Sequence, residues 1–177
     1  MVRAVEGTLG PVDVAVHNAN IAFPFGPFHT LPWEQVAAKL LGEVGAFHAL
    51  AASVVPGMAQ RKWGRIVAVS SSLSRFASEG FGAHCAAKSA LDGACRALAR
   101  DTGPLGITVN AVAPGLVETD ATARQDPAVK AAIAGFTPLR RVGFPGDIGG
   151  VVAFLCIEEA GWITGQYLPL NGGLNTV

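Results

Sequence analysis

The sequence has little charge, and the charges that it has are balanced. Only 15% of the 177 residues are Asp, Glu, Lys or Arg, and the formal net charge is zero. Basic residues occur at most in short groups such as Arg61-Lys62 and Arg140-Arg141. A nucleic-acid-binding surface needs a larger basic patch, so we expect no nucleic-acid partner. Half of the residues are hydrophobic, which indicates a large core or an apolar surface that faces another subunit.

The sequence also has few features of membrane-spanning or disulfide-stabilised proteins. No uninterrupted apolar run reaches the roughly 18 residues of a membrane span, and the first ten residues lack the apolar centre of a signal peptide. The cysteines are Cys85, Cys95 and Cys156, an odd number. If Cys85 and Cys95 share a helix, they lie about 15 Å apart along its axis, too far for a disulfide. We therefore expect free thiols, a cytoplasmic location and no membrane partner.

What the chain does contain is an alternation of apolar strand-like runs and helical stretches. Strands are predicted at residues 12–20, 64–72, 107–115 and 166–173, and the first is expected to be buried on both faces. Helices are predicted at residues 32–55, ended by Pro56, at 83–101 and at 147–157, with a polar loop at 118–130. This order predicts a single α/β domain over residues 1–177. The expected fold is a partial doubly wound, Rossmann-like parallel sheet of about four strands with helices on both faces.

Five segments in this order resemble the short-chain dehydrogenase/reductase (SDR) superfamily: VDVAVHNAN, GRIVAVSSSLS, GFGAHCAAKSAL, GITVNAVAPGLVETD and AGWITGQYLPLNGG. The resemblance implies a site for NAD or NADP over the carboxyl ends of the strands. The glycine-rich turn that lets the backbone approach the pyrophosphate is not found in this sequence.

The first of these segments resembles the fourth strand of the family. We therefore interpret the chain as a truncated SDR-like domain without the dinucleotide-binding half, and we expect no cofactor. A fragment of a longer chain is the alternative interpretation. Against a fragment stands the edge of the first strand, which would be unpaired and apolar. This edge needs cover, most simply from a partner subunit.

The resemblance also implies a set of catalytic residues. The family carries Ser, Tyr and Lys, with an Asn on the long helix. Lys88 matches the lysine, and His84, four residues earlier, stands where the family has tyrosine. Ser71 lies 13 residues before His84 and matches the serine. Gly42 is aligned with the asparagine.

The replacement of tyrosine by His84 suggests a chemistry of its own. Residues four apart share one face of a helix, so His84 and Lys88 are expected to point into the same cleft. The neighbouring ammonium disfavours imidazolium and keeps His84 neutral. His84 is then a candidate general acid or base, with Ser71 holding a substrate oxygen and Lys88 stabilising an enolate. A neutral replacement in an inactive site is the alternative.

Further residues are predicted to bind substrate, and no residues are predicted to bind a metal. The substrate-binding candidates are Asn18, Ser72, Pro114, Gly115 and Thr119.

These features give one leading hypothesis and two alternatives. The leading hypothesis is a cofactor-independent enzyme that carries out dehydration, isomerisation, cyclisation or C–C cleavage on a small apolar carbonyl compound. The alternatives are an NAD(P)-dependent oxidoreductase, as a fragment or completed by a partner chain, and a catalytically dead SDR-like subunit. The resemblance further implies a homodimer or homotetramer built on the small-residue helix at 83–101.

Overall fold

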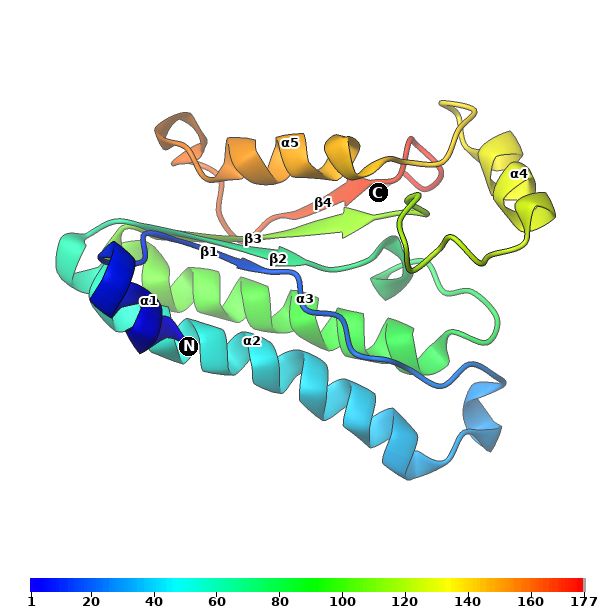
Figure 1. Cartoon of the computed structure of the whole chain (residues 1–177), viewed down its shortest axis with the longest axis horizontal. Coiled ribbons are helices and arrows are strands. Elements are labelled where there is room, and N and C mark those ends of the chain that lie inside the picture. Colours follow the sequence, from blue (N-terminus) through cyan, green and yellow to red (C-terminus); the bar gives the residue numbers. More distant parts are fainter. Residues whose placement is uncertain (177) are drawn as a thin grey trace.

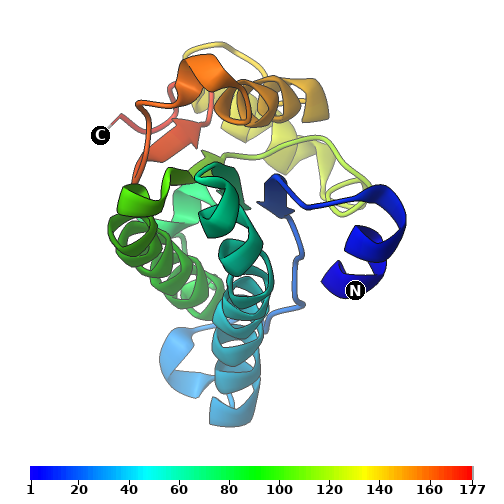
Figure 2. The same ribbon diagram turned by 90° about the vertical axis from the view of Figure 1, so that its left-hand side faces the viewer.

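The computed structural model describes residues 1–176 and is built around a parallel sheet of four strands. The strands lie side by side in chain order: β1 (Val14–His17), β2 (Gly64–Val69), β3 (Ile107–Pro114) and β4 (Tyr167–Leu170). Helices α2 (Trp33–Arg61) and α3 (Gly82–Thr102) cover one face of the sheet, and α5 (Pro145–Leu155) covers the other (Figure 1, Figure 2). This arrangement confirms the predicted fold class.

The remaining elements lie at the ends of the sheet and beside it. Helix α1 (Val2–Leu9) packs beside α2, and α4 (Pro127–Phe136) lies between β3 and α5 in the chain. Four short 3-10 turns complete the description: η1 (Phe28–Thr30), η2 (Ser72–Ser74), η3 (Gly103–Leu105) and η4 (Glu158–Ala160).

Two apolar cores separate the layers. The larger one lies between the sheet and α2 and α3, and it includes Phe47, Met58, Leu91 and Val109. The smaller one lies under α5 and is centred on buried side chains of β2, β3 and α5. Because side chains alternate between the two faces of a strand, each central strand contributes to both cores.

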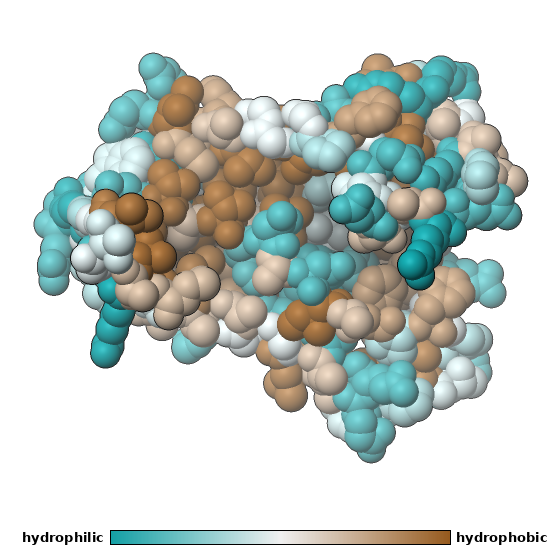
Figure 3. Space-filling view, in the orientation of Figure 1, coloured by the Kyte–Doolittle hydropathy of each residue, from teal (hydrophilic) through white to brown (hydrophobic). Residues whose placement is uncertain are grey.

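Strand β1 departs from the prediction that it is buried on both faces. Ala15 and His17 are buried, whereas Val14 and Val16 remain 38% and 42% exposed. The reason is that β1 is an edge strand and α5 packs over β2 and β3. Figure 3 shows apolar surface on this face of the molecule. Val14 and Val16 of β1 and Val5 and Leu9 of α1 are exposed.

Helix α2 does not end at Pro56, as was predicted, but continues to Arg61 with the proline inside it. Proline removes one backbone hydrogen bond from a helix. The helix nevertheless continues because Val54 and Met58, on either side of Pro56, are both fully buried in the larger core. It ends at Lys62, which adopts a left-handed conformation.

By length and mean hydropathy alone, α2 is also apolar enough to cross a membrane. The sequence contains no uninterrupted apolar run of this length, because polar residues interrupt the hydrophobic residues of α2. The mean hydropathy of the helix is nevertheless high. Here it packs against α3 and the sheet, and it contains the buried charges of Lys39 and Glu43. One face of α2 is therefore packed against the rest of the protein.

The polar loop predicted at residues 118–130 is shorter than expected, because α4 begins at Pro127. The side chain of Asp126 caps this helix by accepting a hydrogen bond of 2.8 Å from the backbone N–H of Ala128. An Asp followed by Pro is a local signal for a helix start. The prediction overlooked it because the surrounding residues are polar.

Candidate functional site

The predicted catalytic residues meet in a cavity of about 390 Å³ at the carboxyl ends of β1, β2 and β3, here called the strand-end cavity. Ser71, His84 and Lys88 all line it. Parallel strands direct the loops that follow them to one edge of the sheet, which is why segments far apart in the sequence converge here.

Most of the predicted substrate-binding residues line the same cavity, namely Asn18, Pro114, Gly115 and Thr119. Ser72 does not. It is 6% exposed, and the cavity is lined by its neighbours Ser70 and Ser71 instead. Ser72 is the first residue of η2, and the turn directs it into the protein. The placement of Ser72 among the substrate-binding residues is therefore corrected.

Ser71 is held at the junction between β2 and η2. Its backbone is extended, and its Oγ accepts a hydrogen bond of 3.2 Å from the N–H of Leu73. A hydroxyl has one donor and two acceptor positions, so this contact leaves the hydroxyl hydrogen free to donate. Ser71 is thus placed to donate a hydrogen bond to an oxygen atom in the cavity.

His84 lies in the first turns of α3 and is buried beside an aromatic side chain. Its ring centroid is 4.5 Å from that of Phe23. Its Nδ1 is buried and has no hydrogen-bond partner among the described residues, so Nε2 is the ring atom left for the cavity. Burial, together with the positive charges of Lys39 and Lys88, lowers the pKa of His84 from 6.5 to about 4. The imidazole is therefore neutral at neutral pH, as the sequence predicted.

Lys88, one helical turn after His84, is held by two acceptors. Its ammonium donates to Glu43 Oε1 over 2.7 Å and to the backbone carbonyl of Val69 over 2.8 Å. Burial lowers the pKa of Lys88, and the hydrogen bond to the Glu43 carboxylate opposes that effect.

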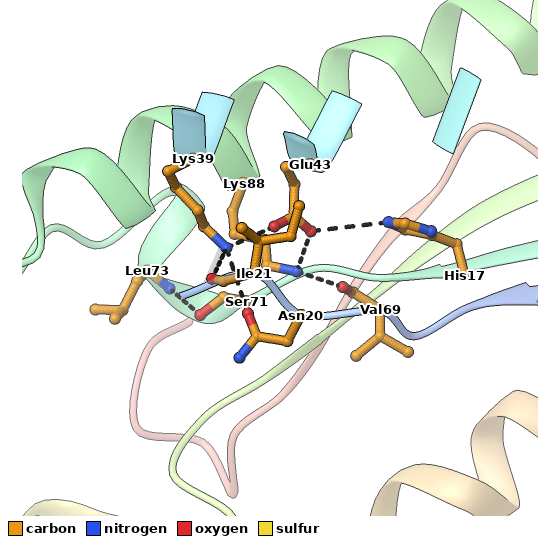
Figure 4. A network of polar contacts seen from close by, with 9 residues as sticks. All are labelled: His17, Asn20, Ile21, Lys39, Glu43, Val69, Ser71, Leu73 and Lys88. Carbon is orange, nitrogen blue, oxygen red and sulfur yellow. Dashed lines mark hydrogen bonds and ion pairs between the residues drawn. The ribbon is translucent and has the colours of Figure 1, made fainter. Parts of the chain in front are cut away.

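Glu43 is fully buried and lies between two ammonium groups (Figure 4). Its Oε2 accepts a hydrogen bond of 2.6 Å from Lys39, and its Oε1 also lies 3.8 Å from Nε2 of His17. Burial alone would raise the pKa of this carboxyl, but the contacts with His17, Lys39 and Lys88 hold it well below its usual range. Glu43 is therefore an anion in the folded protein.

Glu43 also corrects the alignment of the long helix. Gly42 was matched to the family's asparagine, but a side chain at that position would run into Ile21. The side chain of α2 that reaches Lys88 belongs to Glu43, one residue further along. The sequence did carry a signal for this cluster, because Lys39 and Glu43 are charged residues four apart in the interior of the helix, whose other charged residues lie only in its first and last turns.

Asn18 was predicted to bind substrate, and that role stays a prediction. It lines the cavity, but its side chain makes no hydrogen bond to the residues that the structure describes. Asn20, two residues later, accepts a hydrogen bond from Lys39 over 3.3 Å.

Two other features bear on where the site lies. A second cavity, of about 500 Å³, lies at the opposite end of the strands beside Trp63, Arg65 and Trp162, and none of the predicted site residues lines it. Within residues 1–176 there is no group of His, Cys, Asp and Glu side chains that could hold a metal ion.

Comparison with known proteins places this geometry in a family. A family model described as enoyl-(acyl carrier protein) reductase matches residues 1–175. The nodulation protein G of Azospirillum brasilense is 39% identical over 99% of this chain and 71% of its own length. The acetoacetyl-CoA reductase of Allochromatium vinosum is 36% identical over 98% of this chain and 70% of its own length.

The chain belongs to the short-chain dehydrogenase/reductase superfamily. A solved structure agrees with this: YwfH, described as an NADPH-dependent reductase of bacilysin biosynthesis, superposes with a TM-score of 0.92. It is 25% identical and matches 99% of this chain and 72% of its own length. The SDR chain described here is thus shorter than the relatives that it matches.

These relatives overturn two predictions made from the sequence. Cofactor-independent, non-redox chemistry was the leading hypothesis, and no cofactor was expected. One relative is an acetoacetyl-CoA reductase, and the solved structure is described as an NADPH-dependent reductase. The prediction was wrong because it rested on two local differences from the family, the missing glycine-rich turn and the missing tyrosine. The rest of the chain agrees with the family.

Proposed function

We propose that this SDR chain is the catalytic part of an NAD(P)-dependent oxidoreductase that interconverts a carbonyl and a hydroxyl group on an acyl thioester. The observation that carries the proposal is the convergence of Ser71, His84 and Lys88 on one cavity at the strand ends. The substrate class follows from the relatives, since acetoacetyl-CoA is a 3-oxoacyl thioester. The three free cysteines fit a reducing cytoplasm.

The residues present fit the nicotinamide and ribose end of the cofactor. Lys88 can offer a donor to a ribose hydroxyl, and Pro114, Gly115 and Thr119 line the same cavity. The glycine-rich turn that would hold the pyrophosphate is not found in the sequence. Bound at this place, the nicotinamide would supply or accept the hydride.

Ser71 and His84 supply the remaining groups that the reaction needs. The free hydroxyl hydrogen of Ser71 would orient the reacting oxygen of the substrate. His84, neutral at Nε2, would accept a proton from a substrate hydroxyl in the oxidising direction and return it in the reducing direction. Because imidazolium forms only near pH 4 at this site, proton donation by His84 is strongest under acidic conditions.

The experiment measures NADPH binding by calorimetry and NADPH consumption with acetoacetyl-CoA, for the unchanged chain and two variants. His84→Phe keeps an aromatic ring without a proton to exchange, and His84→Tyr restores the residue of the family. We expect turnover in the unchanged chain and in His84→Tyr, and a loss of about 10²–10⁴-fold in His84→Phe. No binding and no NADPH consumption by either the unchanged chain or His84→Tyr would refute the proposal.

A further inference from the structure

The two buried lysines differ in how many of their donors are used. An ammonium group has three N–H donors. Lys39 uses all three, on Asn20 Oδ1 (3.3 Å), the carbonyl of Ile21 (2.9 Å) and Glu43 Oε2 (2.6 Å). Lys88 uses two among the described residues, on Glu43 and Val69. One donor of Lys88 therefore remains, as the contacts in Figure 4 show. Lys88 lines the strand-end cavity, whereas Lys39 does not.

We propose that Glu43 is a positioning residue of this site, which holds the ammonium of Lys88 so that its one free donor serves the ligand in the strand-end cavity. The proposal rests on the proposed function for the identity of that ligand. Lys39 in turn holds the Glu43 carboxylate in place, because its three hydrogen bonds join that carboxylate to Asn20 and Ile21 in the segment that follows β1.

The charges around Lys88 support this role. Lys39 and Glu43 face it from α2, His84 and Asp92 lie on its own helix, and His17 contacts Glu43 from β1. The three ionised groups in direct contact, two ammonium groups and one carboxylate, leave one positive charge beside the cavity. A fixed positive charge stabilises the negative charge that develops on a reacting oxygen.

The charges of Lys39, Glu43 and Lys88 allow a matched pair of variants to be designed. Lys39→Met removes one ammonium and leaves the pair of Glu43 and Lys88 intact. Adding Glu43→Gln to Lys39→Met restores the original net charge of the cluster and removes only the anion that holds Lys88. Both variants keep the volume of the replaced side chains nearly unchanged, and circular dichroism checks that each is folded.

The test is the NMR titration of the lysine side chains in the chain without cofactor. The sequence has four lysines, Lys39, Lys62, Lys88 and Lys130, so the Lys88 signal can be assigned from its absence in Lys88→Met. We expect the pKa of Lys88 to be lower by about 1–3 units in the double variant than in Lys39→Met, because an adjacent opposite charge has been removed. Equal pKa values in the two variants would overturn the proposal.

A second readout separates positioning from a purely structural role. In the NADPH assay, the double variant should lose kcat with little change in substrate KM, and adding Lys88→Met to it should cost nothing more. Full kcat in a folded double variant would contradict the proposal. If no form consumes NADPH, the proposed function fails, and the lysine titration still decides the role of Glu43.

Discussion

The pKa of His84 is set partly by its own helix and partly by a residue of another helix. Its place four residues before Lys88 is visible in the sequence, and both side chains line the strand-end cavity as a helix requires. What the sequence could not show is the second ammonium, from Lys39, because that residue lies on another helix. The two charges and burial together give His84 a much lower pKa than an exposed histidine has.

The lowered pKa of His84 predicts how stability depends on pH. The folded chain protonates His84 near pH 4, whereas the unfolded chain does so near the ordinary value of 6.5. Between these values the unfolded state binds more protons, so acidification from pH 6.5 to 4 should cost about 3 kcal/mol of folding free energy from this group. The loss is complete below pH 4 and absent above pH 6.5.

Denaturant unfolding of the unchanged chain and of His84→Gln checks this prediction. Other groups titrate in the same range, so the informative quantity is the difference between the two proteins at each pH. We expect the unchanged chain to lose more stability than the variant as the pH falls. The same pH dependence in both proteins would show that His84 is not buried as described.

At the scale of elements, α2 combines features that were predicted with one that was not. Its start at Pro32 is a local property, and it was predicted correctly. Its end was not, because the continuation past Pro56 depends on the burial of Val54 and Met58 against other elements. Local propensity stops a helix only where packing does not outweigh it.

Two glycines of α2 offer a test of how tightly this helix is packed. At Gly45 nothing lies within 4 Å of an added Cβ, so Gly45→Ala should stabilise the protein by about 0.5–1 kcal/mol through helix propensity. At Gly42 an added Cβ would overlap the side chain of Ile21, so Gly42→Ala should bring no gain or a loss.

Thermal and denaturant unfolding of both variants gives the comparison. An equal gain in stability for the two substitutions would mean that the segment around Ile21 does not pack on α2. That segment also contains Asn20 and the Ile21 carbonyl, which hold Lys39, so the result bears on the charge cluster as well.

The whole molecule has two surfaces that bear on assembly. One is the edge of β1 with Val14 and Val16, and the other is the outward face of α3, where small residues follow one another at helical spacing (Ala86, Ala90, Gly93 and Ala97). A homodimer or homotetramer through α3 remains a prediction, implied by the resemblance to the SDR family.

Light scattering of three forms tests this assembly. We expect the unchanged chain to have a multiple of its mass of 18.1 kDa and Gly93→Arg to have the monomer mass. An added Cβ at Gly93 meets only the guanidinium of Arg96 within its own subunit, so a side chain can start there without disturbing the fold of the monomer. Val16→Lys, on the β1 edge, tests the other surface, and an unchanged mass for this variant would assign the assembly to α3. A monomer before any substitution would contradict the prediction.

The sequence by itself determined the alternation of strands and helices and hence the parallel sheet, and its resemblance to the SDR superfamily pointed to Ser71, His84 and Lys88. The alternation follows from hydrophobic periodicity, and the spacing of four residues places His84 and Lys88 on one face of a helix. The tertiary structure alone decided that Glu43 and Lys39 join the site, that Ser72 turns away from it, and that β1 is covered on one face only. Each of these depends on contacts between elements distant in the chain, and no local pattern specifies which side chains will meet across them.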